Sequence, residues 1–137
     1  YHEYMEPYER KWTAKIREAG KYSFIHMDGT LKGLLSEVGS AGFRVLEALT
    51  PKPCGDLEFT EIPLLLPRDE IIWGGLPGML FSDFISDEEF DRYVCDILEI
   101  MKTEPRFVLG VADQVPPGAS MARVARVRSL VDRFGRY

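Results

Sequence analysis

Side chains that can bind a metal ion or move a proton follow several apolar runs of this sequence. His26 and Asp28 end the run FIHMDGTL, and Glu47 and Asp113 lie near the ends of two further runs. An imidazole can serve as a general acid or base near neutral pH. Zinc accepts nitrogen and oxygen ligands of this kind, but so do other divalent ions. The catalytic candidates are therefore His26, Asp28 and Asp113, and the candidate metal ligands are His26, Glu47 and Asp113.

A tryptophan and two glycines end another apolar run and are the candidates for a substrate-binding wall: Trp73, Gly74 and Gly75. A structural explanation stands beside this one. A tryptophan is often a core residue, and a glycine pair mainly indicates an unusual backbone turn.

The polar candidates have structural explanations as well. The ring nitrogens of His26 can be satisfied by a neighbouring loop, and Asp28 is equally explained as the N-cap of a following helix. Glu47 precedes a proline-rich turn where it can be solvated, and Asp113 can stabilise its own loop as an Asx-turn.

Short apolar runs alternate with segments of helical periodicity along the chain. Strands are predicted near residues 22–26, 43–49, 70–73 and 106–111. Helices are predicted near residues 4–16, 31–38, 86–101 and 124–134, with a short one from Asp56 to about residue 62. Ser86 and Glu89 have the spacing of a capping box at the start of the third long helix.

Fourfold alternation of strand and helix predicts right-handed crossovers and a parallel sheet covered by helices. We expect an α/β fold that corresponds to the C-terminal half of a TIM (β/α)8 barrel, with a small doubly wound sheet as the alternative. No glycine-rich dinucleotide motif follows any strand. Catalytic groups lie beyond the carboxyl ends of parallel strands, so the polar candidates should converge there.

Composition excludes several classes of protein. The 137 residues carry 17 basic and 22 acidic side chains, a net charge of −5, which argues against a nucleic-acid partner. No apolar run approaches the roughly 20 residues that span a bilayer, so no membrane association is expected. Cys54 and Cys95 lack metal-ligand spacing, which favours free thiols and a cytoplasmic location. The arginines of the last helix, Arg123 among them, are expected on a solvated face.

The chain begins at Tyr1, not methionine, and we interpret residues 1–137 as a single partial domain. Half a barrel leaves unpaired strand edges. We therefore expect either a missing N-terminal half or a homodimer mate to cover them, and we expect the isolated fragment to be inactive.

Four segments together resemble the C-terminal half of the uroporphyrinogen decarboxylase superfamily, in order and in spacing. The segments are FIHMDGTLKGLLSEVGSAGFRVLEAL, TPKPCGD, IIWGGLPG and LGVADQVPPGA. The resemblance extends from about Tyr8 to the end of the chain. The superfamily contains the decarboxylase and related cobalamin-dependent methyltransferases, and its fold is an eight-stranded barrel.

The resemblance implies a zinc site in the methyltransferase branch, where zinc activates a thiol for methyl transfer from a corrinoid carried by a partner protein. His26 matches the histidine of the family's His-x-Cys motif, Asp28 stands where the first cysteine would be, and Asp113 stands about where the last would be. Oxygen ligands in place of two thiolates would leave more positive charge on the metal, which would then act more as a Lewis acid.

Three functions follow as hypotheses. The favoured one is a corrinoid-linked methyltransferase with a zinc ion. The first alternative is decarboxylation of porphyrinogen acetate groups in porphyrin biosynthesis, with a tetrapyrrole as the bound partner. That chemistry needs arginines that the family supplies largely from its N-terminal half. The second alternative is a non-catalytic binding domain that keeps the barrel architecture.

Overall fold

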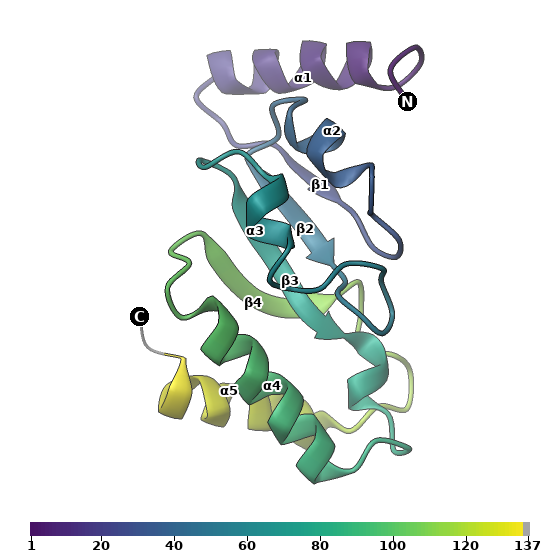
Figure 1. Cartoon of the computed structure of the whole chain (residues 1–137), viewed down its shortest axis with the longest axis vertical. Coiled ribbons are helices and arrows are strands. Elements are labelled where there is room, and N and C mark those ends of the chain that lie inside the picture. The colour runs from purple at the N-terminus through teal and green to yellow at the C-terminus, as the bar shows by residue number, and fades with distance from the viewer. Residues whose placement is uncertain (136–137) are drawn as a thin grey trace.

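The predicted α/β fold is confirmed: the four strands form one open, all-parallel sheet. The computed structural model describes residues 1–135, and within them the strand order is β1-β2-β3-β4 (Figure 1). Each strand pairs in parallel with its neighbour in sequence. The sheet does not close on itself in this described part, which is the arrangement of half a barrel.

Strands and helices alternate along the chain. The elements are α1 (Glu6–Glu18), β1 (Phe24–His26), α2 (Leu35–Gly39), β2 (Val45–Leu49), α3 (Ile62–Leu65), β3 (Ile71–Pro77), the 3-10 helix η1 (Gly78–Phe81), α4 (Asp87–Met101), β4 (Phe107–Ala112) and α5 (Met121–Phe134). In Figure 1, α1 lies at the β1 end of the molecule, whereas α4 and α5 lie at the β4 end. None of the described helices is both long and apolar enough to cross a bilayer.

The main core lies on one face of the sheet. Strand pairing aligns one residue from each strand in a single row: Ile25, Leu46, Ile72 and Phe107. The last three are buried with side chains of α2, α3 and α4, and Ile25 packs against them. Because successive side chains of a strand point to opposite faces, the alternate residues lie on the other face. There Phe24, Trp73 and Val108 are exposed.

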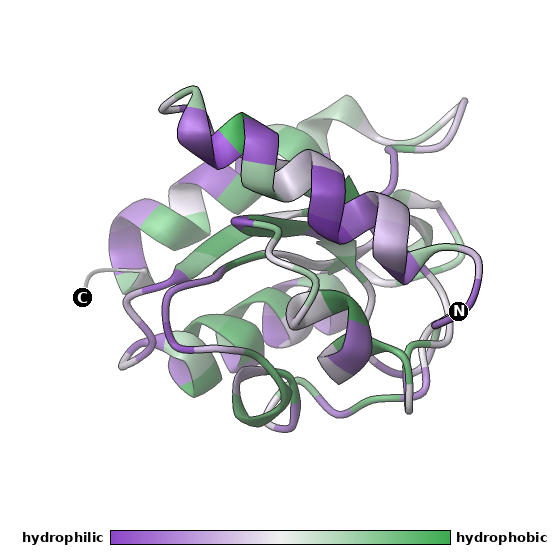
Figure 2. Cartoon of the chain, turned by 90° about the horizontal axis from the view of Figure 1, so that it is seen from above, coloured by the Kyte–Doolittle hydropathy of each residue, from purple (hydrophilic) through white to green (hydrophobic). Residues whose placement is uncertain are grey.

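A second core joins α4 and α5 to the end of β3 and to η1. Val124 and Val127 of α5 pack against buried Phe90 and Val94 of α4. The predicted capping box is confirmed, because Ser86 accepts from the Glu89 N–H and Glu89 accepts from the Ser86 N–H. In Figure 2 the strands are mainly hydrophobic, whereas the helices alternate hydrophobic and hydrophilic residues.

Arg123 is not on a solvated face, so that prediction was wrong. Its side chain is 7% exposed and donates to the carbonyls of three residues around η1: Leu80, Ser82 and Ile85. It also forms an ion pair with Asp87 at the start of α4. An arginine carries five donors, so one buried guanidinium can satisfy several loop carbonyls that sequence periodicity does not identify.

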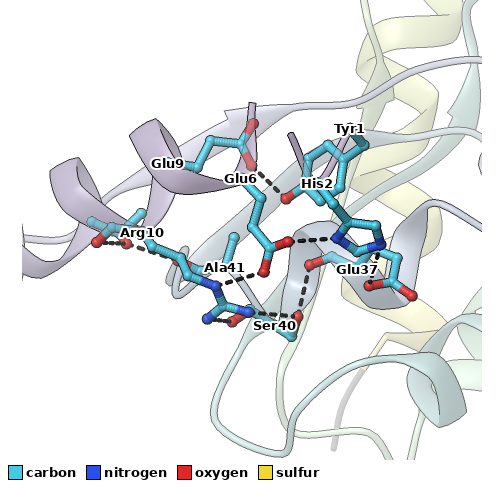
Figure 3. A network of polar contacts seen from close by, with 9 residues as sticks. Tyr1, His2, Glu6, Glu9, Arg10, Glu37, Ser40 and Ala41 are labelled. Atoms are coloured by element: carbon cyan, nitrogen blue, oxygen red, sulfur yellow. Dashed lines mark hydrogen bonds and ion pairs between the residues drawn. The ribbon is translucent and has the colours of Figure 1, made fainter. Parts of the chain in front are cut away.

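Polar contacts attach α1 and the residues before it to α2. Arg10 donates to the Ser40 carbonyl and pairs with Glu6, which also contacts His2 (Figure 3). Buried Thr13 donates to the Ala41 carbonyl. The aromatic residues at helical spacing in and before this helix do not face the core: Tyr4, Tyr8 and Trp12 are all more than half exposed.

Two predicted boundaries differ from the structure. Strand β3 does not end at Trp73 but continues through both glycines to Pro77. A Cβ on Gly74 would lie 2.5 Å from the Leu49 carbonyl oxygen, so this glycine marks a close approach of two backbones and not the end of a strand. The short helix begins at Ile62, and Asp56 instead accepts the backbone N–H groups of Leu31 and Lys32.

The position of Leu46 in the core row gives a stability prediction. We expect Leu46→Ala to lower the free energy of unfolding by about 2–5 kcal/mol, because the side chain is fully buried between the sheet and its helices. Leu64→Ala removes the same atoms from a residue that is 83% exposed and should change stability by less than about 0.5 kcal/mol. Urea unfolding checks both, and equal effects would contradict the assigned core.

Candidate functional site

A histidine and a glutamate meet at the carboxyl ends of β1 and β2. His26 is the last residue of β1 and stands opposite Glu47 of β2 in the parallel register. Its Nδ1 lies 2.7 Å from Glu47 Oε2. An ionised carboxylate only accepts, so the ring donates from Nδ1 and its orientation is fixed by Glu47.

An aspartate from the opposite edge of the sheet completes this group. Asp113 directly follows β4, and its Oδ1 lies 3.6 Å from His26 Nε2. That distance is too long for a hydrogen bond but short enough for electrostatic attraction. Strands β1 and β4 are the two edges of the sheet, so the sheet must curve strongly here. The structure thus brings the three predicted metal ligands together.

Backbone strain is concentrated at the same place. Among the described residues, the non-glycine residues with positive φ are Ala48 (63°) and Asp113 (67°). Ala48 follows Glu47 directly, and the pairing of β2 with β3 is irregular between Leu46 and Leu49. Left-handed backbone at non-glycine residues costs free energy and is enriched at functional sites.

A cavity of about 450 Å³ opens beside Asp113 at this end of the sheet. Asp28 and Asp113 line it together with neutral residues, and no lysine or arginine of residues 1–135 is among its lining residues. Asp28 is exposed. Its alternative role as helix cap is not what the structure shows, because the N-cap of α2 is Leu34, without a side-chain cap.

Asp56 accepts the backbone N–H groups of the turn that leads into α2, so it orders this segment without capping the helix itself. The hydrogen bond from the Leu31 N–H, and to a smaller extent the one from the Lys32 N–H, holds the pKa of Asp56 below its usual range. Asp28 itself is exposed and lines the cavity.

The predicted substrate wall lies elsewhere on β3. Trp73 is 42% exposed on the open face of the sheet, and its indole covers Gly110, where a Cβ would lie 2.4 Å from the indole Nε1. Gly74 and Gly75 are buried inside the strand, and neither is among the described residues that line the cavity. The structure does not bring these three residues to His26 through any described contact.

The sequence reasoning missed four neutral polar residues that line the cavity: Thr50, Cys54, Ser82 and Gln114. Cys54 is a free, exposed thiol with its Sγ 3.0 Å from Met79 Sδ. The turn TPKPCGD, which directly follows β2, was the available signal, since it begins at the same carboxyl end as Glu47.

The predicted zinc site is incomplete in these residues. Protein zinc sites use three or four protein ligands. Within residues 1–135, no three His, Cys, Asp or Glu side chains are arranged to hold one ion. Glu47 occupies one ring nitrogen of His26, which leaves only His26 Nε2 and Asp113 facing each other. The donor set therefore does not fit zinc by itself, and no chemical step below depends on a metal.

The fold and site define an α/β half-barrel with a carboxylate-flanked histidine at the carboxyl ends of its strands. The chain matches no protein-family model and no curated protein sequence. The superfamily thus rests on the motif resemblance alone.

The left-handed backbone of Asp113 yields a prediction. Asp113→Gly and Asp113→Ala both remove the carboxylate, but only alanine keeps a Cβ at a φ of 67°. We expect the glycine variant to be more stable than the alanine variant by about 1 kcal/mol. Chemical denaturation of the two variants measures the difference, and an alanine variant of equal or greater stability would contradict the strained backbone.

Proposed function

We propose that this chain is the C-terminal half of a barrel enzyme similar to the uroporphyrinogen decarboxylase superfamily, and that it acts in methyl transfer with a corrinoid-carrying partner. The observation that carries this proposal is the group formed by His26, Glu47 and Asp113 at the carboxyl ends of the strands. Active sites of barrel enzymes lie at that end.

The charge of the cavity favours methyl transfer over decarboxylation. Asp28 and Asp113 line it, and within residues 1–135 no lysine or arginine does. His26 and Glu47 do not line it but adjoin it through the contact of His26 with Asp113. A porphyrinogen carries several carboxylates, which these acidic groups would repel. A methyl group is uncharged and its transfer requires no basic binding residues.

His26 acts as a base in the proposed reaction. A thiol or hydroxyl acceptor must lose its proton to become a good nucleophile. With Nδ1 donating to Glu47, the His26 Nε2 carries the lone pair that accepts this proton. The resulting imidazolium lies between Glu47 and Asp113, and both carboxylates stabilise its charge.

The test compares site variants in the complete barrel, with methylcobalamin as donor and a small thiol as acceptor. We expect His26→Ala to lower the rate of methyl transfer by about a hundredfold or more, since it removes the base. Glu47→Gln should lower it by about tenfold, since it weakens the orientation of the ring. The loss of the methylcobalamin spectrum reports the rate.

Arg128→Ala is the matched control, because Arg128 pairs with Asp132 on the exposed side of α5 and does not line the cavity. Its rate should equal that of the unaltered protein. Decarboxylation of a porphyrinogen without methyl transfer would overturn the proposal in favour of the decarboxylase. Binding of neither a corrinoid nor a porphyrinogen would indicate a non-catalytic domain.

We also propose that the open edges of the sheet associate with a missing barrel half or with a second copy of this chain. The outer side of β1 pairs with no described strand, and exposed Tyr22 and Phe24 lie there. Tyr8 and Trp12 of α1 line the same hollow as these two residues. Unpaired edges with exposed apolar side chains promote association.

We expect the isolated chain to have a mass in solution of about twice 15.6 kDa by light scattering. Phe24→Lys should shift it toward the monomer, because a charge replaces a side chain that is 65% exposed on the edge strand. Phe84→Lys, at a residue 71% exposed outside the strands, is the control and should leave the mass unchanged. A monomeric unaltered chain would contradict self-association.

A further inference from the structure

A second cavity lies at the opposite, amino end of the sheet. Its volume is about 440 Å³, within the range of small-molecule sites. The C-terminal end of α1, the loop after α2 and the segments that lead into β1, β2 and β3 surround it. Three of its lining residues are basic: Arg17, Lys21 and Arg44.

One of the residues that line this cavity is a buried glutamate with an unsatisfied carboxyl oxygen. Glu70 lines the cavity, is 3% exposed, and its Oε2 has no hydrogen-bond partner in the described part of the chain. An unpaired buried polar atom costs free energy, so native proteins usually satisfy it with a ligand or water. This observation points to a ligand independently of the basic residues.

The groups around Glu70 leave it mostly protonated at neutral pH. Burial, and after it the charge of Asp69, raises the pKa of Glu70 to about 8. Arg106 and Arg44 act in the opposite direction but do not compensate. Arg44 is already paired with Asp69 at 3.0 Å, and Arg106 with Glu104.

Two cationic side chains that line the cavity have no side-chain partner among the described residues. Within residues 1–135, neither Arg17 nor Lys21 forms a side-chain hydrogen bond or ion pair, and both are exposed at the mouth. A protonated carboxyl has an O–H to donate, and arginine and lysine only donate. All three groups therefore offer donors, and an oxyanion is the ligand whose acceptors match them.

We propose that this amino-end cavity binds a small oxyanion, such as the carboxylate or phosphate group of a metabolite, between Arg17, Lys21 and the carboxyl of Glu70. The site is separate from the His26 group and does not depend on the proposed methyl transfer. Because the anion accepts from protonated Glu70, ionisation of this residue removes a donor and adds a repelling charge.

Titration calorimetry with succinate tests the proposal, because the succinate carboxylates keep the same charge between pH 7 and pH 9. We expect binding at pH 7 and an affinity that falls about tenfold for each pH unit above about 8. Inorganic phosphate as a second probe distinguishes a preference for phosphate from one for carboxylate. Equal concentrations of chloride control for ionic strength.

Variants separate the roles of the residues. Glu70→Gln keeps a permanent donor, so it should bind succinate at least as tightly at pH 9 as the unaltered chain does at pH 7, without pH dependence. Arg17→Ala with Lys21→Ala should weaken binding at least tenfold. Lys11→Ala is the matched control, because Lys11 lies on the same helix but does not line the cavity.

Three results would overturn the proposal: no binding of either probe at millimolar concentration, loss of binding in Glu70→Gln, or an affinity that rises with pH. The last two would show that an ionised Glu70 pairs with a cation.

A measurement of stability against pH accompanies these titrations as a folding control. Glu70 holds its proton in the folded chain up to about pH 8 but releases it near pH 4.5 when the chain is unfolded. The free energy of unfolding should therefore fall as the pH rises from about 4.5 to about 8. Glu70→Gln should remove that decline.

Discussion

Parallel pairing of four short strands is the constraint on which the carboxyl-end site depends. It places the end of every strand at the same edge, so groups that are up to 87 residues apart in sequence, His26 and Asp113, face each other across 3.6 Å. Pairing alone would leave these residues at opposite edges of a flat sheet. The curvature of the sheet brings them together, and the main core packs the sheet against α2, α3 and α4.

The same geometry has a cost that is visible in the backbone. Both left-handed non-glycine residues, Ala48 and Asp113, adjoin or belong to the histidine group in the described chain. Gly74 fits against the backbone of Leu49 only because it lacks a Cβ. Irregular pairing, strain and close backbone contact thus coincide where Glu47 orients His26. Such features reduce stability and are enriched at functional sites, so their position supports a functional role for this end of the sheet.

Sequence reasoning predicted the features that depend on periodicity and strand order. It predicted the four strands, the parallel sheet, the capping box at Ser86 and the convergence of His26, Glu47 and Asp113. It missed features set by tertiary contacts. Arg123 is buried and donates to loop carbonyls, Asp56 accepts the N–H of Leu31, and the aromatic residues of α1 are exposed. The amino-end cavity around Glu70 was missed for the same reason, since its walls come from three stretches of the chain that are far apart in sequence.

The site depends on the orientation of His26 by Glu47, and the tautomer of the His26 ring reports that orientation. The chain has only two histidines, so nitrogen-15 NMR of the imidazole rings gives two sets of signals that His2→Gln assigns. At a pH where the rings are neutral, the account predicts that His26 carries its proton on Nδ1, and that Glu47→Gln shifts this population. A His26 ring protonated on Nε2, or one unaffected by Glu47→Gln, would contradict it.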